Sequence, residues 1–381
     1  MMKMNRIFVP VGQGAFYIED FTEGVVIYDC GSSTKTDKEI ANIIDSYLKK
    51  KVVYAIFISH FHQDHISGIP HILKNYEVKN IFFPLMRENE KIIMQSYHLV
   101  NKGKQGDFIF KFIENPLETI REIVGDSKIP ILYEVLEEIE DESEIKDTVE
   151  NKSSEIKKIS SGSNVANEVG ISNWEFILFN FREKSRIEEL EKKFKESEPL
   201  EDSLGEFIRR KIENNDLKNI QEIYSKIPGD LNTNSMTLFS GSSREVDVGI
   251  LLICPDSFYP FVFFDKTPEC FDKIREFFKK SGALYTGDYD AGGKHKIRKL
   301  MKKYEKYWER IGCLQLPHHG SKHNFSEKFL EINTFFVISA GTKNKYKHPH
   351  VKILKNLLLN QKIVFIVTEK KESELSFRIY I

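Results

Sequence analysis

The stretch ISHFHQDHISG, residues 58–68, decides the fold, because it places four potential metal ligands within six residues. They are His60, His62, Asp64 and His65, in the spacing H-x-H-x-D-H. Imidazole and carboxylate groups are costly to bury without a partner. A lone histidine in a loop is usually solvated, but four such groups at this spacing favour a metal site. Nitrogen and carboxylate ligands together suit zinc, manganese or iron.

The residues on either side place this stretch between a strand and a helix. The run VVYAIFIS, residues 52–59, is apolar, β-branched and short, which predicts a buried strand. The run after the histidines contains Gly68 and Pro70 and then acquires helical spacing. The four ligands therefore lie on a strand-to-helix loop, where α/β proteins place chemistry.

The rest of the chain has an α/β pattern. Helices are expected at 38–50, 294–309 and from about 351, and the last two strands are expected to form a hairpin. The other expected strands are 6–12, 15–20, 25–33, 78–85, 173–181, 234–241, 248–255, 282–290, 311–316, 335–341, 362–369 and 375–381.

Two charged segments interrupt this pattern, at about 87–172 and 182–228. We interpret them as mostly helical insertions in a single domain spanning residues 1–381. They are candidates for a lid or for docking a protein partner. Such charge runs are more often solvated helix faces than binding surfaces.

The composition and the start of the chain indicate a protein of the cytoplasm. Of the 381 residues, 40% are hydrophobic, enough for a substantial core, yet no apolar run reaches the length of a membrane span. The first twenty residues lack the features of a signal peptide. The expected location is therefore the cytoplasm.

The cysteines have no CxxC spacing and are expected to be free thiols in a reducing compartment: Cys30, Cys254, Cys270 and Cys313.

The net charge of −1 hides an uneven distribution. Residues 266–381 carry 24 Lys and Arg against 12 Asp and Glu, so this third has 12 excess positive charges. A basic segment of this kind could face an anionic substrate such as nucleic acid. The same charges could also be spread over solvated helix faces.

Polar clusters follow three of the predicted strands: residues 60–65, Asp288, and His318 with His319. Ligands in open α/β sheets bind at the strand ends. The order of the motifs resembles the metallo-β-lactamase fold superfamily, and within it the hydrolase domain of the ComEC/Rec2 competence proteins and the related phosphorylcholine esterases. The matching motifs are VGQGAFYI, VIYDCGS, ISHFHQDHISG, NTNSMTL, LYTGDYD, LPHHGSKHNFSEKFLE and YKHPH.

This resemblance implies an αββα sandwich with two divalent ions, zinc or manganese, at one edge. Carried over by motif, His60 and His62 hold the first metal, and Asp64 and His65 hold the second. Asp288 of T-G-D bridges both metals, and one of His318 and His319 completes the second site. Asp29 is implied to orient the histidine loop from behind the ligands.

The chemistry that the resemblance implies is hydrolysis. A water between two dications loses a proton near neutral pH and becomes a nucleophile, which Asp64 can position. The histidine of the pair His318/His319 that binds no metal can contact a phosphate oxygen or protonate the leaving group. Anion contacts are expected from four further residues: Ser321, Lys322, His348 and His350.

Two departures from the family pattern bear on the activity, through a metal ligand, and on the substrate, through a missing carboxylate. The β-lactamases and glyoxalases have a further metal histidine before the bridging aspartate, whereas the matching segment here is NTNSMTL. The ComEC-like branch lacks that histidine as well, which argues against lactam hydrolysis. Second, the family reads G-Q-G-D where this chain has Ala15.

The sequence therefore supports three hypotheses. The first is a metal-dependent phosphodiesterase, and more specifically a nuclease acting on DNA or RNA. The second is a hydrolase of a small phosphoester or cyclic nucleotide. The third is a hydrolase subunit of a multi-protein complex, for example in bacterial defence, with the charged insertions as docking segments.

Overall fold

The computed structural model describes most of the chain. The described residues are 3–49, 51–101, 103–138, 155–181, 204–214, 235–243, 249–253 and 279–380, with the single residues 192, 216, 218, 222 and 277. Most of the second predicted insertion, 182–228, and two of the cysteines, Cys254 and Cys270, lie outside these ranges. Within them, no helix is long and apolar enough to cross a membrane.

The first sheet contains nine of the described strands, in the order β10-β15-β1-β2-β3-β4-β5-β6-β7. From β3 to β7 the neighbours are parallel, and from β10 to β3 they are antiparallel. Its strands are β1 (Lys3–Phe8), β2 (Phe16–Phe21), β3 (Gly24–Cys30), β4 (Val52–Phe57), β5 (Asn80–Pro84), β6 (Ile131–Val135), β7 (Ile156–Ile159), β10 (Gly249–Ile253) and β15 (Leu375–Tyr380).

The second sheet contains six described strands, in the order β14-β13-β12-β11-β9-β8. Strands β11 to β14 are parallel, β9 pairs antiparallel with β11, and β8 pairs antiparallel with β9. Its strands are β8 (Trp174–Phe179), β9 (Thr237–Ser242), β11 (Gly282–Tyr285), β12 (Ile311–Gln315), β13 (Phe335–Ser339) and β14 (Val364–Val367).

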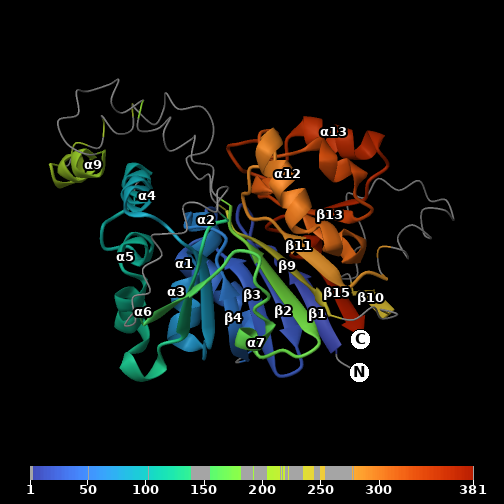
Figure 1. The fold of residues 1–381 in the computed structure, drawn as a ribbon, viewed down its shortest axis with the longest axis horizontal. Coiled ribbons are helices and arrows are strands. Elements are labelled where there is room, and N and C mark those ends of the chain that lie inside the picture. The colour runs from blue at the N-terminus through green and yellow to red at the C-terminus, as the bar shows by residue number, and fades with distance from the viewer. Residues whose placement is uncertain are drawn as a thin grey trace.

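Helices cover the outer faces of both sheets (Figure 1). Helices α1 (Asp37–Leu48), α3 (Ile69–Asn75), α5 (Phe108–Glu114) and α6 (Pro116–Val124) lie on the first sheet, and α12 (Lys294–Lys303) and α13 (Val351–Leu359) lie on the second. Among the described residues, the other α-helices are α2 (Gln63–Ile66), α4 (Glu88–Val100), α7 (Ala166–Val169) and α9 (Leu204–Glu213), and the 3-10 helices are η1 (Asp126–Lys128), η3 (Glu305–Arg310), η4 (His318–Gly320), η5 (Glu327–Glu331) and η6 (Lys371–Ser373).

The packing follows these layers. One apolar cluster fills the space between the sheets, with Tyr17, Phe57 and Tyr285 among its members. A second cluster joins α1, α3, α5 and α6 to the first sheet, and a third joins α12 and α13 to the second sheet. A sheet or an amphipathic helix must bury its apolar face against another element, and three clusters between four layers satisfy that need. The αββα sandwich predicted from the sequence is confirmed.

A buried ion pair joins the two sheets inside this sandwich. Arg6 of β1 donates to Glu19 of β2, with an Nη2 to Oε1 distance of 2.7 Å. From the second sheet, the hydroxyl groups of Ser240 and Tyr285 donate to the same carboxylate at 2.5 and 3.0 Å. Arg6 also donates to the carbonyl oxygens of Ser240 and Ser281. We call Arg6, Glu19, Ser240 and Tyr285 the inter-sheet network.

Two local predictions differ from the structure. The closing hairpin is wrong, because β14 lies in the six-stranded sheet and β15 lies between β10 and β1 in the other sheet. The predicted insertion 87–172 holds helices, as its spacing indicates, but it also supplies β6 and β7, which extend the first sheet in parallel. Parallel strands that pair are far apart in the sequence, so no local sequence pattern indicates that β6 pairs with β5 and that β7 pairs with β6.

Candidate metal centre

The histidine loop begins where β4 ends and rests on the end of β3. After Phe57 the chain leaves the sheet, and α2 then carries Asp64 and His65 in one helical turn. Glycine is needed at two places beneath this turn. A Cβ at Gly31 would lie 2.6 Å from the backbone nitrogen of His65, and one at Gly14 would lie 2.8 Å from the carbonyl oxygen of Asp64. The motifs VGQG and DCGS therefore allow the loop to approach the strand.

Asp29, at the end of β3, holds the loop from below. Its Oδ1 accepts a hydrogen bond from the backbone nitrogen of Ser59 at 2.7 Å, and its Oδ2 accepts from Ser59 Oγ at 2.7 Å and from His65 Nδ1 at 2.8 Å. Ser59 Oγ in turn lies 2.9 Å from His60 Nδ1. Burial raises the pKa of Asp29, although His65 and Ser59 oppose that shift. These bonds turn Nε2 of both rings towards the site.

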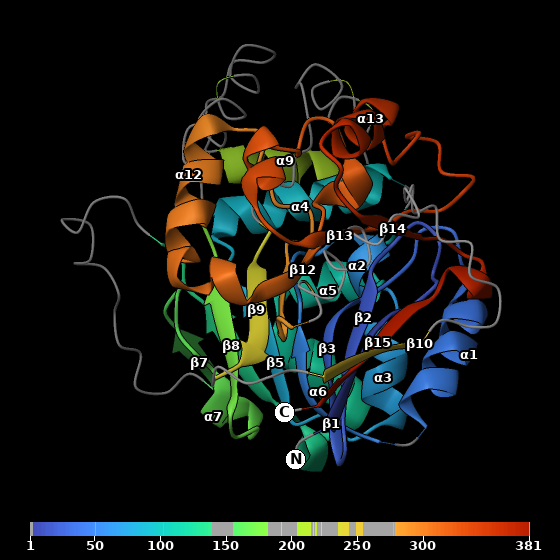
Figure 2. The same cartoon turned by 90° about the vertical axis from the view of Figure 1, so that its right-hand side faces the viewer.

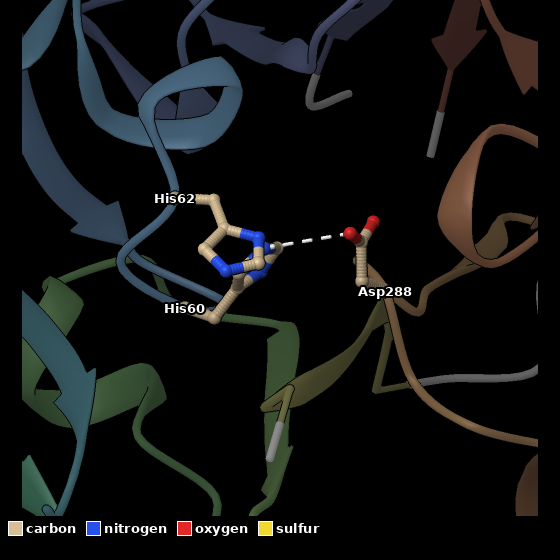
Figure 3. A group of neighbouring side chains, drawn as sticks. All are labelled: His60, His62 and Asp288. Atoms are coloured by element: carbon tan, nitrogen blue, oxygen red, sulfur yellow. Dashed lines mark ion pairs between the residues drawn. The ribbon is translucent and has the colours of Figure 1, made fainter. Parts of the chain in front are cut away.

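Two groups of three ligands gather above this base. In the first, one ligand atom from each of His60, His62 and Asp288 lies within 4.8 Å of the others. Figure 3 shows the two imidazole rings side by side, facing Asp288 from the opposite side of the site. His60 Nε2 lies 3.5 Å from Asp288 Oδ2. The ring of Tyr97, from α4 (Glu88–Val100), stacks on His62 with centroids 5.1 Å apart.

The second group consists of Asp64, His65 and His319, with ligand atoms again within 4.8 Å of one another. His319 Nδ1 donates to the carbonyl oxygen of Ser339 at 2.7 Å, and its Nε2 lies 3.2 Å from Asp64 Oδ2. His318 and His319 both have a positive φ, of 49° and 55°, and their ring centroids lie 6.0 Å apart with the ring planes at 72°. The structure thus brings His319, rather than His318, into a group of three ligands.

Asp288 lies between the two groups. Its Oδ2 faces His60 Nε2 of the first group, and its Oδ1 lies 3.3 Å from His65 Nε2 of the second. The backbone nitrogen of Asp288 donates to Ser235 Oγ at 3.0 Å, which fixes the turn after β11. One carboxylate can therefore contact ions in both groups.

The buried polar atoms of the site fit cations. His60 Nε2, His62 Nε2, His65 Nε2 and Asp288 Oδ1 are buried and have no hydrogen-bond partner. Buried polar groups are normally hydrogen-bonded. Four such atoms facing one another, three nitrogens and a carboxylate oxygen, match the ligand set of a zinc or manganese centre.

The electrostatics of the site favour positive charge. Burial would raise the pKa of Asp288, but His318, His65 and His60 hold it well below its ordinary value. For Asp64 too, burial would raise the pKa, but the hydrogen bond with His319 and the charges of His65 and His319 together lower it. Burial lowers the pKa of His60, which keeps its ring neutral and able to donate a lone pair.

His318 belongs to neither group and lies at the side of the site. Its Nε2 is 3.7 Å from Asp288 Oδ2, and its side chain is 22% exposed. Asn324 Nδ2 donates to the carbonyl oxygen of Asp288, so Asn324 Oδ1 is left to accept from His318 Nδ1 at 3.1 Å. This arrangement directs His318 Nε2 towards the space above the carboxylate.

The four residues predicted to bind an anion are not equally placed. The ring of His348 lies 5.6 Å from that of His318, and burial lowers its pKa to about 4. Ser321 is buried, and its hydroxyl accepts from the backbone nitrogen of His323. His350 Nδ1 accepts from the backbone nitrogen of Lys352 at the start of α13. Lys322 is exposed on the same loop as Ser321.

Sequence reasoning missed residues that support the ligands. Ser235, in the segment NTNSMTL that lacks the family histidine, lies 3.5 Å from His60 Nδ1 and contacts the backbone of Asp288. Tyr97 comes from the predicted insertion and had no local signal. Ala15, where the family has aspartate, is buried, and its backbone nitrogen donates to the carbonyl oxygen of Asp64.

Comparisons with known proteins agree with the motifs at the start of the chain. Residues 9–84 match the family model described as the metallo-beta-lactamase superfamily. Ribonuclease J of Mycoplasma genitalium is 35% identical over 80 residues, covering 19% of this chain and 14% of that protein. ComE operon protein 3 of Bacillus subtilis is 27% identical over 97 residues, covering 25% of this chain and 12% of that protein.

The matched region is thus a small part of those relatives, at 14% and 12% of their lengths. A crystal structure of human tRNase Z, short form, aligns over 96% of this chain and 92% of its own, with 9% identity and a TM-score of 0.40. The family model and the relatives support the metallo-β-lactamase superfamily. They do not single out the ComEC-like branch.

Proposed function

We propose that this protein is a metal-dependent phosphodiesterase that cleaves nucleic acid with two divalent ions. The observation that carries the proposal is the pair of three-ligand groups with Asp288 between them. His60 and His62 would hold one ion, Asp64, His65 and His319 the other, and Asp288 both. Zinc and manganese are the ions expected from this donor set.

The bound ions would supply a nucleophile at neutral pH and withdraw electrons from the phosphoryl group. Asp64, whose side chain is 20% exposed, would orient the attacking water by accepting a hydrogen bond. His318 Nε2, held in direction by Asn324, would donate a proton to the leaving oxygen or a hydrogen bond to the phosphate. His348, beside it, would contact a phosphate oxygen.

Two observations favour nucleic acid over a small phosphoester. The first is the similarity of the N-terminal part to ribonuclease J, a protein whose name describes action on RNA. The second is the excess of 12 positive charges in residues 266–381, which contain Asp288, His318 and His348. The predicted role of the charged insertions, as a lid or a docking site for a protein partner, stays part of this proposal.

The test is an assay of the purified protein with Mn²⁺ or Zn²⁺ on labelled single- and double-stranded DNA and RNA, with bis-p-nitrophenyl phosphate alongside. We expect polymer cleavage, and a loss of about a thousandfold or more in the Asp64→Ala/His65→Ala variant, because ion binding supplies several kcal/mol of transition-state stabilisation. The matched control is Asp45→Ala/His71→Ala, which removes a surface Asp–His pair at 2.8 Å. It should keep full activity.

The outcomes separate the hypotheses. Cleavage of the small ester alone would replace the nuclease by a small-phosphoester hydrolase. Equal activity in Asp64→Ala/His65→Ala would overturn the proposed centre. Bound metal, measured by elemental analysis, without activity on any substrate would point to a missing partner.

A further inference from the structure

An exposed aromatic ring lies close to the metal centre and plays no part in the core. Tyr346 is in the loop between β13 and α13, and 58% of its surface is exposed. The described part of the chain has three other exposed large apolar side chains, Ile131 at 44%, Val351 at 74% and Leu359 at 71%. Single exposed apolar side chains are common on protein surfaces, so the surroundings of this ring, rather than its exposure alone, indicate a ligand.

Tyr346 is connected to the centre by a row of rings. Its ring stacks on His348, with centroids 5.9 Å apart and planes at 17°. The ring of His348 lies 5.6 Å from that of His318, and His318 lies beside Asp288. Two ring contacts, Tyr346 to His348 and His348 to His318, therefore connect the exposed ring to the histidine beside Asp288.

The loop holds this ring in place. Asn344 Nδ2 donates to the carbonyl oxygens of Gly341 and His348, both at 2.6 Å. Asn344 Oδ1 accepts from the backbone nitrogen of His348 at 2.8 Å. These bonds close the loop around Tyr346, so the ring is presented before a ligand arrives, which lowers the entropy cost of binding.

The same loop is strongly basic. Lys343, Lys345 and Lys347 flank Tyr346, all three are exposed, and none forms an ion pair with the described residues. The segment 341–352, GTKNKYKHPHVK, contains no aspartate or glutamate. Lys345 Nζ lies 5.2 Å from the centre of the Tyr346 ring. An aromatic face among unpaired cations matches a ligand with a flat ring and several phosphates.

We propose that Tyr346 is a stacking platform for a base of a single-stranded nucleic acid whose phosphates lie along Lys343, Lys345 and Lys347. This inference rests on the proposed nuclease function and adds the strandedness of its substrate. A base in a duplex is stacked on its neighbours and has no free face, whereas a single strand offers its bases to aromatic side chains. The row from Tyr346 to His318 directs such a strand to the metal centre.

The test is the affinity for fluorescein-labelled oligonucleotides, measured by anisotropy in chelator so that no strand is cut. The probes are a short single strand, an abasic strand of equal length and a duplex. Tyr346→Ala should weaken binding of the base-bearing strand about tenfold and narrow its advantage over the abasic strand. Tyr346→Trp should restore the affinity for the base-bearing strand. Leu359→Ala, at another exposed apolar side chain, should bind like the wild type.

Lys345→Gln is the complementary variant. It should weaken the base-bearing and abasic strands equally and reduce the salt dependence of binding, because it removes a phosphate contact. The inference is overturned if Tyr346→Ala binds the base-bearing strand as the wild type does, if it weakens both strands equally, or if the wild type prefers the duplex. Hydrolysis of bis-p-nitrophenyl phosphate by the wild-type protein tests the proposed function separately, since that ester has no base.

Discussion

The inter-sheet network and the metal centre are both buried groups of charged side chains, yet they satisfy their polar atoms in opposite ways. In the network, Glu19 accepts from Arg6, Ser240 and Tyr285, and Arg6 makes two further hydrogen bonds to backbone carbonyl oxygens. In the centre, three imidazole nitrogens and a carboxylate oxygen face one another without a hydrogen-bond partner.

This difference separates a structural role from a binding role. A satisfied buried ion pair holds elements in register, and breaking it is costly because one charge is left alone. Unsatisfied ligands of matching type face one another only where the fold holds them in place, as Asp29 does for His65 and, through Ser59, for His60. Burial alone does not distinguish the two, since Glu19 and Asp288 are both 3% exposed.

The largest effect on stability is expected from the network. Glu19→Ala leaves Arg6 buried without its partner and should lower the free energy of unfolding by about 3–5 kcal/mol. Urea unfolding followed by tryptophan fluorescence measures this loss. Arg6→Met/Glu19→Leu, which removes both charges, should cost less than Glu19→Ala. A larger cost for the double variant would show that the pair, rather than its imbalance, stabilises the fold.

An intermediate effect is expected from metal at the centre. Zn²⁺ or Mn²⁺ at about a hundred times its dissociation constant should stabilise the wild type by about 2.7 kcal/mol, and chelator should remove this gain. Asp288→Asn should lose most of the gain, because Asp288 faces both ligand groups. Glu19→Gln should keep it. Thermal unfolding with and without metal measures these shifts, and an equal gain in Asp288→Asn would contradict the assignment of that carboxylate.

The smallest effect is expected from a solvated Asp–His pair. Hydrogen bonds from Tyr76 and His71 lower the pKa of Asp45, whose side chain is 52% exposed. Because the folded pKa lies below the unfolded value, the contribution is present above about pH 4 and is lost as the pH falls through the folded pKa. Asp45→Asn should cost less than about 1 kcal/mol at pH 7.

Thermal unfolding of wild type and Asp45→Asn at pH 7 and pH 3 checks this prediction. The difference in thermal stability between the wild type and Asp45→Asn should shrink at the lower pH. A difference that grew at pH 3 would mean that the charged form of Asp45 is not the stabilising one. Together, the three predictions compare how much charged side chains stabilise the protein when their burial and their partners differ.

Local sequence was informative where a motif and a strand end coincide. The spacing of His60, His62, Asp64 and His65 after an apolar run predicted the ligand loop, and T-G-D placed Asp288 after a strand. It was uninformative where partners come from distant segments. Tyr97 contacts His62, but nothing in its own neighbourhood indicates this. Ser235 and Asn324 lie within the motifs NTNSMTL and LPHHGSKHNFSEKFLE, but those motifs did not identify their contacts with His60 and His318. The closing strands look like a hairpin because sequence proximity does not reveal that the chain crosses from one sheet to the other.

The sequence by itself determined the layered α/β architecture and the set of candidate ligands, because both depend on periodicity and on the spacing of residue types within one loop. The tertiary structure decided which member of the pair His318/His319 joins a ligand group, since neighbouring residues point in directions set by the backbone and by Ser339 and Asn324. In Figure 2, helix α2, which carries Asp64 and His65, lies in the same upper part of the view as strands β12 and β13. The tertiary structure also decided that Asp288 lies between both groups and that Tyr346 stands beside them, because those relations join the loops that follow β4, β11, β12 and β13.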